Sequence, residues 1–217
     1  MMTMANRGRF ITLEGGEGAG KSTLLAGLVD RLTERNIATV QTREPGGTPL
    51  AETVRTLALH PPQGNKWSPM AEALLMNAAR SNHLDERIRP ALSRGDWVLC
   101  DRFSDSTLAY QSIGGVPIET LRMMEASVLK DTVPDLTLIL DAPPSELIAR
   151  RADRGAPLDA FEARPQDFHD AVRAAFLTIA ESDRTRYLVL DALAPAASVL
   201  DTAWSAISER LIMLQAD

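Results

Sequence analysis

The sequence predicts a single α/β domain built on a five-stranded parallel sheet with helices on both faces. Five short, continuous apolar runs are typical of strands that are buried on both sides, and stretches of helical character lie between them. Strands that alternate with helices favour a parallel sheet, because each crossover helix returns the chain to the same end of the sheet. The chain has 217 residues, of which 45% are hydrophobic, and it shows no repeat or linker. We therefore expect one domain over residues 1–217.

The expected elements follow the apolar runs and the helical patterns in chain order. Strands are expected at residues 10–13, 37–42, 97–100, 136–140 and 187–190. Helices are expected at residues 21–33, 49–59, 69–92 and 197–214. The last helix has an apolar side that includes Trp204, so we expect this residue in the core.

Composition and charge argue against several classes of protein. The formal net charge of −6 disfavours broad nucleic-acid binding. No apolar run is long enough to span a membrane, and the polar N-terminus does not resemble a secretory signal. The single cysteine, Cys100, excludes an internal disulfide, and the three histidines are too scattered to predict a zinc site. We expect a cytoplasmic protein that binds neither nucleic acid nor a membrane.

Residues 15–22 carry the strongest local signal. They read G-G-E-G-A-G-K-S and match the phosphate-binding pattern G-x-x-x-x-G-K-[ST], between an expected strand and an expected helix. Glycines let the backbone curl until several N–H groups point at one anion, and the start of the helix adds the positive end of its dipole. The residues expected to hold the phosphates of a nucleotide are Gly15, Gly16, Glu17, Gly18, Ala19, Gly20, Lys21, Ser22 and Thr23.

Two side chains of this P-loop have expected roles. Lys21 would place a point charge on the β- and γ-phosphates, and Ser22 would give a hydroxyl ligand to Mg²⁺. A glycine-rich turn that matches by chance is the alternative, and the strand and helix around the motif disfavour it. The loop alone leaves the reaction open, because GTPases, motor ATPases and small-molecule kinases all use it.

Asp101 and Arg102 directly follow the expected strand at residues 97–100. In a parallel sheet the carboxyl ends of the strands face one crevice, so both side chains should lie near the P-loop. A carboxylate there suits Mg²⁺, directly or through water, and an arginine suits a phosphate because its planar fork can hold two oxygens. The alternative is a surface pair that caps the next helix.

Beyond the P-loop, the sequence resembles thymidylate kinases over nearly its whole length. Residues 42–48 read T-R-E-P-G-G-T, and residues 72–80 resemble the family's E-x-L-L-x-x-A-A-R helix. Residues 101–111 resemble its D-R-x-x-x-S-x-x-A-Y-Q segment, and residues 134–141 its P-D-L-T-L-x-L-D strand. The resemblance implies a P-loop nucleoside-monophosphate-kinase-like fold with a mobile lid at about residues 150–162.

The reaction that the resemblance implies is direct in-line transfer of the γ-phosphoryl group from MgATP to dTMP, giving ADP and dTDP for dTTP biosynthesis. The family also implies a homodimer. A kinase of another monophosphate or of a deoxynucleoside is the nearest alternative. A nucleotide-binding switch or ATPase is a second, and the acceptor motifs at residues 42–48 and 101–111 argue against it. An inactive binding module is a third, which the presence of Lys21, Asp101 and Arg102 disfavours.

The resemblance also assigns the residues that would bind dTMP. Arg43 and Arg102 would hold its phosphate, and Glu17 would accept a hydrogen bond from its 3′-hydroxyl. Arg80 would donate to O4 of thymine, and Tyr110 would leave little room for a 2′-hydroxyl. The full expected set is Glu17, Arg43, Pro45, Met76, Arg80, Arg102, Ser106, Thr107, Tyr110 and Gln111.

Two departures from the family pattern bear on function. Met76 stands where the family usually has a phenylalanine that stacks on thymine, and methionine gives a weaker, less oriented contact. In the lid, Ala160 replaces the usual arginine of the D-R-[FI]-E tail. Among Arg150, Arg151 and Arg154, the last is expected to stabilise the transferred phosphoryl group, so the expected catalytic residues are Lys21, Arg102 and Arg154.

Overall fold

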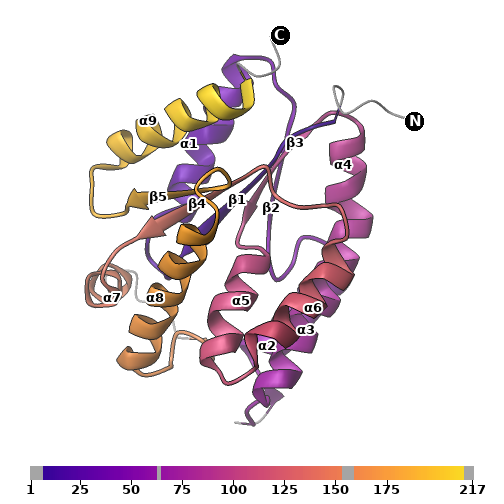
Figure 1. The fold of residues 1–217 in the computed structure, drawn as a ribbon, viewed down its shortest axis with the longest axis vertical. Coiled ribbons are helices and arrows are strands. Elements are labelled where there is room, and N and C mark those ends of the chain that lie inside the picture. The colour runs from indigo at the N-terminus through magenta and orange to yellow at the C-terminus, as the bar shows by residue number, and fades with distance from the viewer. Residues whose placement is uncertain (1–6, 63–64, 153–158, 213–217) are drawn as a thin grey trace.

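The computed structural model describes residues 7–62, 65–152 and 159–212. Five parallel strands form one sheet in the order β2-β3-β1-β4-β5 (Figure 1). The strands are β1 (Phe10–Gly15), β2 (Thr39–Arg43), β3 (Trp97–Asp101), β4 (Leu136–Asp141) and β5 (Tyr187–Asp191). The predicted five-stranded parallel sheet is confirmed, and each strand ends one or two residues later than the apolar run that predicted it.

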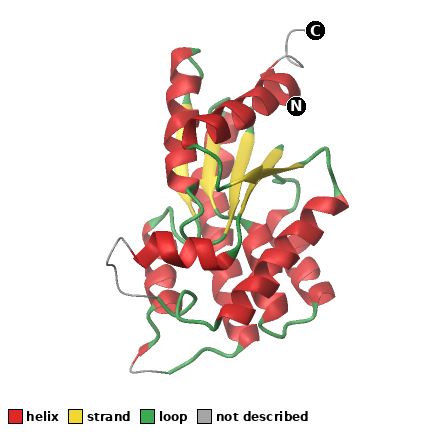
Figure 2. Cartoon of the chain, turned by 90° about the vertical axis from the view of Figure 1, so that its left-hand side faces the viewer, coloured by secondary structure: helices red, strands yellow, loops and turns green. Residues whose placement is uncertain are grey.

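Helices cover both faces of the sheet, as Figure 2 shows from the side. The α-helices are α1 (Lys21–Glu34), α2 (Pro49–Leu59), α3 (Pro69–His83), α4 (Arg89–Ser93), α5 (Ser104–Ile113), α6 (Ile118–Leu129), α7 (Pro144–Ala152), α8 (Gln166–Ser182) and α9 (Ala196–Ile207). Two π-helical turns, η3 (Leu84–Ile88) and η4 (Ser208–Ile212), continue α3 and α9. In the part of the chain that the structure describes, no helix has both the length and the apolar character needed to cross a membrane.

The prediction of one regular helix over residues 69–92 is wrong. α3 ends at His83, the wider turn η3 follows, and α4 begins at Arg89. Pro90 has no N–H to donate to the carbonyl of Glu86, and its ring crowds that carbonyl, so a regular helix cannot run through unchanged. The C-terminal helix likewise changes to a π-helical turn after Ile207.

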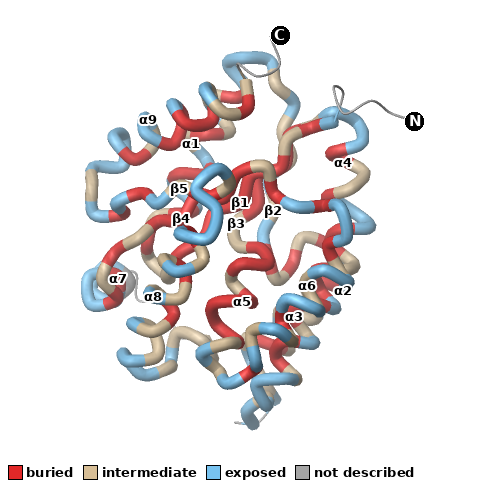
Figure 3. The backbone as a smooth tube through the Cα atoms, viewed as in Figure 1, coloured by how far each residue is buried: buried red, intermediate tan, exposed pale blue. Residues whose placement is uncertain are grey.

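The core lies on both sides of the central strands, where buried backbone runs through the sheet in Figure 3. Alternate residues of β1 serve the two faces. Ile11 and Leu13 join the apolar cluster that also includes residues of α1 and α9, whereas Phe10 joins the cluster under η3 and α4. Cys100 and Trp204 are both buried, as predicted, and burial raises the pKa of the Cys100 thiol.

One buried carboxylate joins β1 to the start of α5. Glu14 Oε1 accepts hydrogen bonds from the backbone N–H groups of Phe103 (2.8 Å) and Ser106 (3.3 Å). Its other oxygen, Oε2, accepts one from the Ser106 hydroxyl (2.6 Å). Burial, followed by the nearby Asp105 carboxylate, raises the pKa of Glu14 from 4.5 to about 7. The side chain therefore holds the turn after β3 in place. With this pKa, the carboxyl group is partly protonated near neutral pH.

Glu14→Gln is expected to change how stability depends on pH. Between the ordinary pKa of 4.5 and the raised pKa of about 7, the folded protein keeps a proton that the unfolded chain loses. The contribution of Glu14 to the free energy of unfolding therefore falls as the pH rises through this window and is level above it. Glutamine has no proton to lose, so the free energy of unfolding of the variant should rise relative to that of the original protein across the window.

Urea denaturation at several pH values measures this difference. Glu119→Gln, at an exposed position on α6, is the matched control and should show no such trend. A difference between Glu14→Gln and the original protein that is constant with pH would show that Glu14 is not the group that keeps the proton.

Candidate functional site

A cavity of about 310 Å³ opens beyond the carboxyl ends of β1, β2 and β3. This is the end of a parallel sheet at which ligands bind, and the volume suits a small molecule. Its walls come from the segments after β2 and β3, from α2, α3 and α5, and from the turn at residues 159–162. Every residue expected to bind dTMP lines it: Glu17, Arg43, Pro45, Met76, Arg80, Arg102, Ser106, Thr107, Tyr110 and Gln111. The two candidate metal ligands, Ser22 and Asp101, line it as well.

The P-loop connects β1 to α1 beside this cavity. A smaller hollow of about 40 Å³ borders Gly15 and Gly16 and lies between β4, α7 and α8. Glu17 and Tyr110 line both spaces, so the two spaces are adjacent. The loop needs glycine at Gly15, where φ is 125° and a Cβ atom would lie 2.3 Å from the backbone oxygen of Leu140.

Lys21 folds back over the loop. Its Nζ donates to the backbone oxygens of Gly15 (3.2 Å) and Gly16 (2.9 Å), and burial lowers the pKa of the ammonium group. The cation is thus held at the loop whose N–H groups are expected to bind phosphate. Thr23, the last residue of the expected phosphate-binding set, is exposed on the first turn of α1 and does not line the cavity.

Ser22 and Asp101 meet at the mouth of the loop. The Ser22 hydroxyl donates to Asp101 Oδ2 over 3.3 Å. Asp101 Oδ1 is buried and has no hydrogen-bond partner among the described residues. Hydroxyl and carboxylate oxygens are the ligands that Mg²⁺ prefers, and a buried carboxylate oxygen without a partner fits a cation. These two residues are therefore the ones that could hold Mg²⁺ beside the P-loop.

Arg102 occupies the centre of the site. Its backbone has a positive φ of 67°, which is uncommon for a residue other than glycine, and Glu14 holds the next residue of this turn. The guanidinium donates to Glu17 Oε1 (2.7 Å from Nη2), to the Ser106 hydroxyl (3.0 Å) and to the Tyr110 hydroxyl (3.4 Å). First Arg102 and then Lys21 hold the pKa of Glu17 well below its usual range. Glu17, expected at the 3′-hydroxyl of the substrate, is thus paired with a residue expected to bind the phosphate.

Two further arginines reach the same cavity. Arg43 forms an ion pair with Glu52 (3.1 Å), and Arg55 donates to the backbone oxygen of Pro45 (2.9 Å). Burial, followed by the nearby Arg43, lowers the pKa of Arg55. Sequence reasoning missed Arg55, and its only signal was a place in the helix that follows the T-R-E-P-G-G-T segment. Arg43, Arg55 and Arg102 thus place three guanidinium groups along the cavity, and Arg43 and Arg102 are paired with Glu52 and Glu17.

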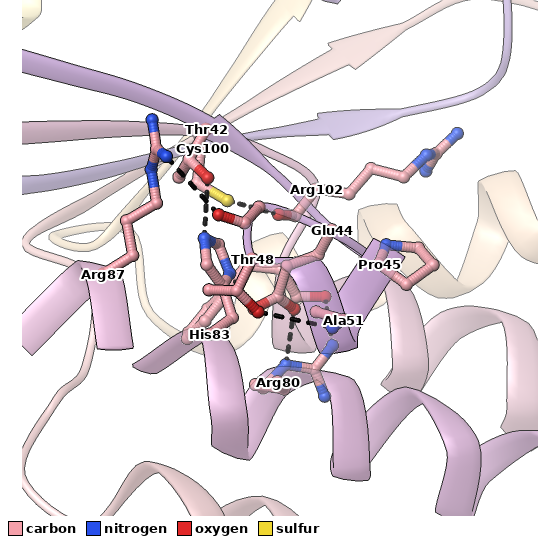
Figure 4. A network of polar contacts seen from close by, with 12 residues as sticks. Thr42, Glu44, Pro45, Thr48, Ala51, Arg80, His83, Arg87, Cys100 and Arg102 are labelled. Atoms are coloured by element: carbon pink, nitrogen blue, oxygen red, sulfur yellow. Dashed lines mark hydrogen bonds and ion pairs between the residues drawn. The ribbon is translucent and has the colours of Figure 1, made fainter. Parts of the chain in front are cut away.

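Another part of the cavity wall is built around a buried glutamate, shown in Figure 4. Glu44 Oε2 accepts from Arg80 Nε over 2.7 Å, and Glu44 Oε1 lies 3.0 Å from Nδ1 of His83. Arg80 Nη2 also donates to the Thr107 hydroxyl and to the backbone oxygen of Phe103, both over 3.0 Å. Arg80 is therefore rigidly held, and Met76 lines the cavity one helical turn before it.

Sequence reasoning gave no role to Glu44 or His83, although Glu44 lies within the T-R-E-P-G-G-T segment and His83 lies three residues after Arg80 on α3. His83 also contacts the Thr42 hydroxyl at 2.6 Å and is completely buried, so it acts in the support of the site. The sequence carried a usable signal for both, since each falls on or next to a motif that had been identified.

Residues near the lid close the far side of the cavity. Asp159, Phe161 and Glu162 line it, and the ring of Phe161 lies edge-on to that of Tyr110 with centroids 5.9 Å apart. Of the candidate lid arginines, Arg150 is exposed and donates to the backbone oxygen of Ala192 (2.8 Å), away from the cavity. Arg154 and the side chain of Arg151 lie outside the described residues.

Comparisons with known proteins agree on one family. Residues 13–202 match the family model described as thymidylate kinase. The thymidylate kinase of Chromohalobacter salexigens is 48% identical over 205 residues, which cover 94% of this chain and 97% of that protein. That of Pseudomonas fluorescens is 52% identical over 193 residues, 88% of this chain and 91% of the relative.

A solved structure gives the same result. The crystal structure of thymidylate kinase from Ehrlichia chaffeensis superposes with a TM-score of 0.74 at 31% identity and covers 93% of this chain and 99% of that one. The family model spans most of the sequence, and the relatives match over nearly their whole length. This chain belongs to the thymidylate kinase family.

Proposed function

We propose that residues 1–217 form one P-loop kinase domain that phosphorylates dTMP to dTDP with ATP, by direct in-line transfer of the γ-phosphoryl group. The observation that carries this proposal is the cavity lined by three arginines, directly beside the P-loop. A loop that holds a triphosphate and a separate cavity lined by arginines suit two phosphorylated substrates that meet end to end. No covalent intermediate is needed, because catalysis of this kind is alignment plus neutralisation of charge.

The cations of the site support the in-line arrangement. The loop N–H groups and Lys21 would hold ATP, and Arg43, Arg55 and Arg102 would hold the acceptor phosphate. Two dianionic phosphates repel each other, so fixed cations are needed to bring them into line. An arriving phosphate competes with Glu17 for Arg102, since that guanidinium already donates to Glu17 Oε1. Release of Glu17 would free its carboxylate to accept from the 3′-hydroxyl of dTMP.

Ser22 and Asp101 would hold Mg²⁺ between the loop and the cavity. Two features support this: both side chains offer oxygen ligands, and they lie within 3.3 Å of each other. Bound there, Mg²⁺ would neutralise charge that develops on the phosphoryl oxygens. Lys21 and Arg102 would orient the reacting groups.

Other residues of the cavity support selection of thymine and deoxyribose. Arg80 would donate to O4 of the base, where cytosine instead carries an amino group and could not accept. Arg80 is locked by Glu44 and Thr107, so it presents a donor at a fixed position. Met76 would lie on the ring of thymine, and Tyr110 would exclude a 2′-hydroxyl. Ser106, Gln111 and Pro45 would complete the pocket.

We also propose that the protein works as a homodimer in the cytoplasm. Large apolar side chains are exposed on three neighbouring helices, at Leu50 on α2, Leu74 on α3 and Met123 on α6. Pairing with a second copy would cover such a surface, since soluble monomers rarely leave large apolar patches open. Sedimentation at micromolar concentration tests this, and a monomer mass would contradict it.

Initial rates of ADP formation with dTMP, dUMP, dCMP and thymidine test the main proposal. We expect dTMP to give the highest kcat/KM. Thymidine should be a poor acceptor because it brings no phosphate to the arginines, and dCMP should fail at Arg80. Removal of Mg²⁺ with a chelator should abolish turnover. ATP hydrolysis that is indifferent to dTMP would instead support the nucleotide switch.

Met76→Phe tests the base pocket. Met76 is buried and lines the cavity, so a flat aromatic ring at this place should stack on thymine at least as well. We expect the Kd for dTMP, measured by titration calorimetry, to stay the same or to decrease. A severalfold weaker affinity would contradict the assignment of residue 76 as the base-stacking position.

Alanine variants of Arg150, Arg151 and Arg154 test which lid arginine stabilises the transferred group. We expect Arg154→Ala to lower kcat by about a thousandfold, the usual effect of losing such an arginine. Arg150→Ala should have less effect, because its guanidinium is bonded to the loop after β5. Near-normal turnover of Arg154→Ala, together with loss in Arg150→Ala, would contradict the choice.

A further inference from the structure

Glu72 is a buried carboxylate on the cavity side of α3 to which no role has yet been given. Only 8% of its surface is exposed. It precedes Met76 by four residues and Arg80 by eight, so all three lie on one face of the helix. Met76 and Arg80 line the cavity of about 310 Å³ in which dTMP is proposed to bind, here called the acceptor cavity. Burial of a charge costs free energy unless the charge is paired, so the partners of Glu72 indicate its structural role.

The carboxylate joins three separate elements. Arg164 Nη2 donates to both of its oxygens, over 2.6 and 2.7 Å. Gln111 Nε2 on α5 donates to Oε2 over 3.4 Å, and Gln111 itself lines the cavity. Glu72 therefore connects α3 to α5 and to the segment that precedes α8.

Arg164 is held from its other sides by aromatic rings. Its guanidinium carbon lies 4.6 Å from the ring centres of both Phe161 and Phe168. Such contacts favour a cation that has been removed from water. Arg164 is also the only basic residue among residues 159–165. It is therefore the one cation of that stretch that can anchor it to Glu72.

The anchored segment is a wall of the cavity. In the turn at residues 159–162, Asp159 Oδ1 accepts from the backbone N–H groups of Phe161 (2.8 Å) and Glu162 (2.9 Å). One backbone hydrogen bond, from Ala160 to Leu59 (3.2 Å), connects this turn to α2. The Arg164 to Glu72 ion pair connects the other end of the segment to α3. The turn is thus held across the cavity between two helices.

We propose that Glu72 and Arg164 are positioning residues, whose ion pair fixes the 159–162 wall and orients Gln111 so that the cavity fits the acceptor nucleotide. Neither side chain needs to touch the substrate. The effect should fall on acceptor binding, because both ends of the ion pair act on walls of the acceptor cavity and neither lies at the P-loop. This inference rests on the proposed function, in that the acceptor is taken to be dTMP.

The experiment measures KM for dTMP at saturating ATP, and KM for ATP at saturating dTMP, in the full-length protein. Arg164→Ala and Glu72→Gln should each raise KM for dTMP by about tenfold and leave KM for ATP within about twofold, given the sensitivity of binding to small displacements. Arg164→Lys, which keeps the charge but loses the planar fork, should recover part of the loss. The double variant should be no worse than the worse single one, since both changes break one interaction.

Arg9→Ala is the matched control. Arg9 forms a partly buried ion pair with Asp135 (3.3 Å) and does not line the cavity, so its loss should leave both KM values unchanged. Thermal melting checks that each variant folds, and Arg164→Lys keeps the test informative if Arg164→Ala does not fold.

Three outcomes would overturn the inference. They are an unchanged KM for dTMP in the folded variants, a parallel rise of both KM values, and effects of the single variants that add in the double variant. Failure of the proposed function would give a different result, because the unmodified protein would then show no dTMP-dependent turnover at all.

Discussion

The site depends on the hydrogen bonds that the buried Glu14 carboxylate accepts from the start of α5. Glu14 is the next-to-last residue of the central strand β1, and it accepts hydrogen bonds from the backbone N–H groups of Phe103 and Ser106 at the start of α5. Through this one side chain, the loop that is expected to hold ATP and the turn that carries Arg102 keep a constant relation. The positive φ of Arg102 is an unfavourable conformation, and the hydrogen bonds to Glu14 help to maintain it.

Charge in the site is balanced before any substrate arrives. Arg102 is paired with Glu17 and Arg43 with Glu52, while Lys21 lies against backbone carbonyls. Each of these three cations therefore has protein partners of its own. Phosphate oxygens could replace these partners, because Arg43 and Arg102 line one cavity and Lys21 lies at the adjacent P-loop. This arrangement lets a chain of net negative charge bind two highly anionic substrates.

Three buried glutamates organise the walls of the cavity in the same manner. Glu14 holds the turn with Arg102, Glu44 holds Arg80 and His83, and Glu72 holds Arg164 and Gln111. In each case a carboxylate from one element restrains groups from another, in a setting of low dielectric where such contacts are strong. Loop and turn residues thus gain the rigidity that positioning of a substrate requires.

Local sequence patterns predicted the sheet and the P-loop of this protein. Five apolar runs predicted the strands of a parallel sheet, and the glycine spacing at residues 15–22 predicted the P-loop, because burial and backbone conformation act over a few neighbouring residues. Since strand ends converge in such a sheet, Asp101 and Arg102 were expected near the P-loop, whereas Arg43 was expected at the site only from the family resemblance. The residues expected to bind dTMP came from the family resemblance, and they do line one cavity.

Only the tertiary structure revealed how these residues are held. The partners of Glu14, Glu44 and Glu72 lie between 36 and 92 residues away in the chain, and no local pattern encodes such pairs. Arg55 and the wall at residues 159–162 join the cavity for the same reason. The sequence by itself thus determined the sheet, the P-loop and the chemistry at the strand ends. The fold decided which buried carboxylates position them, because ion pairs depend on distance in space and not on distance along the chain.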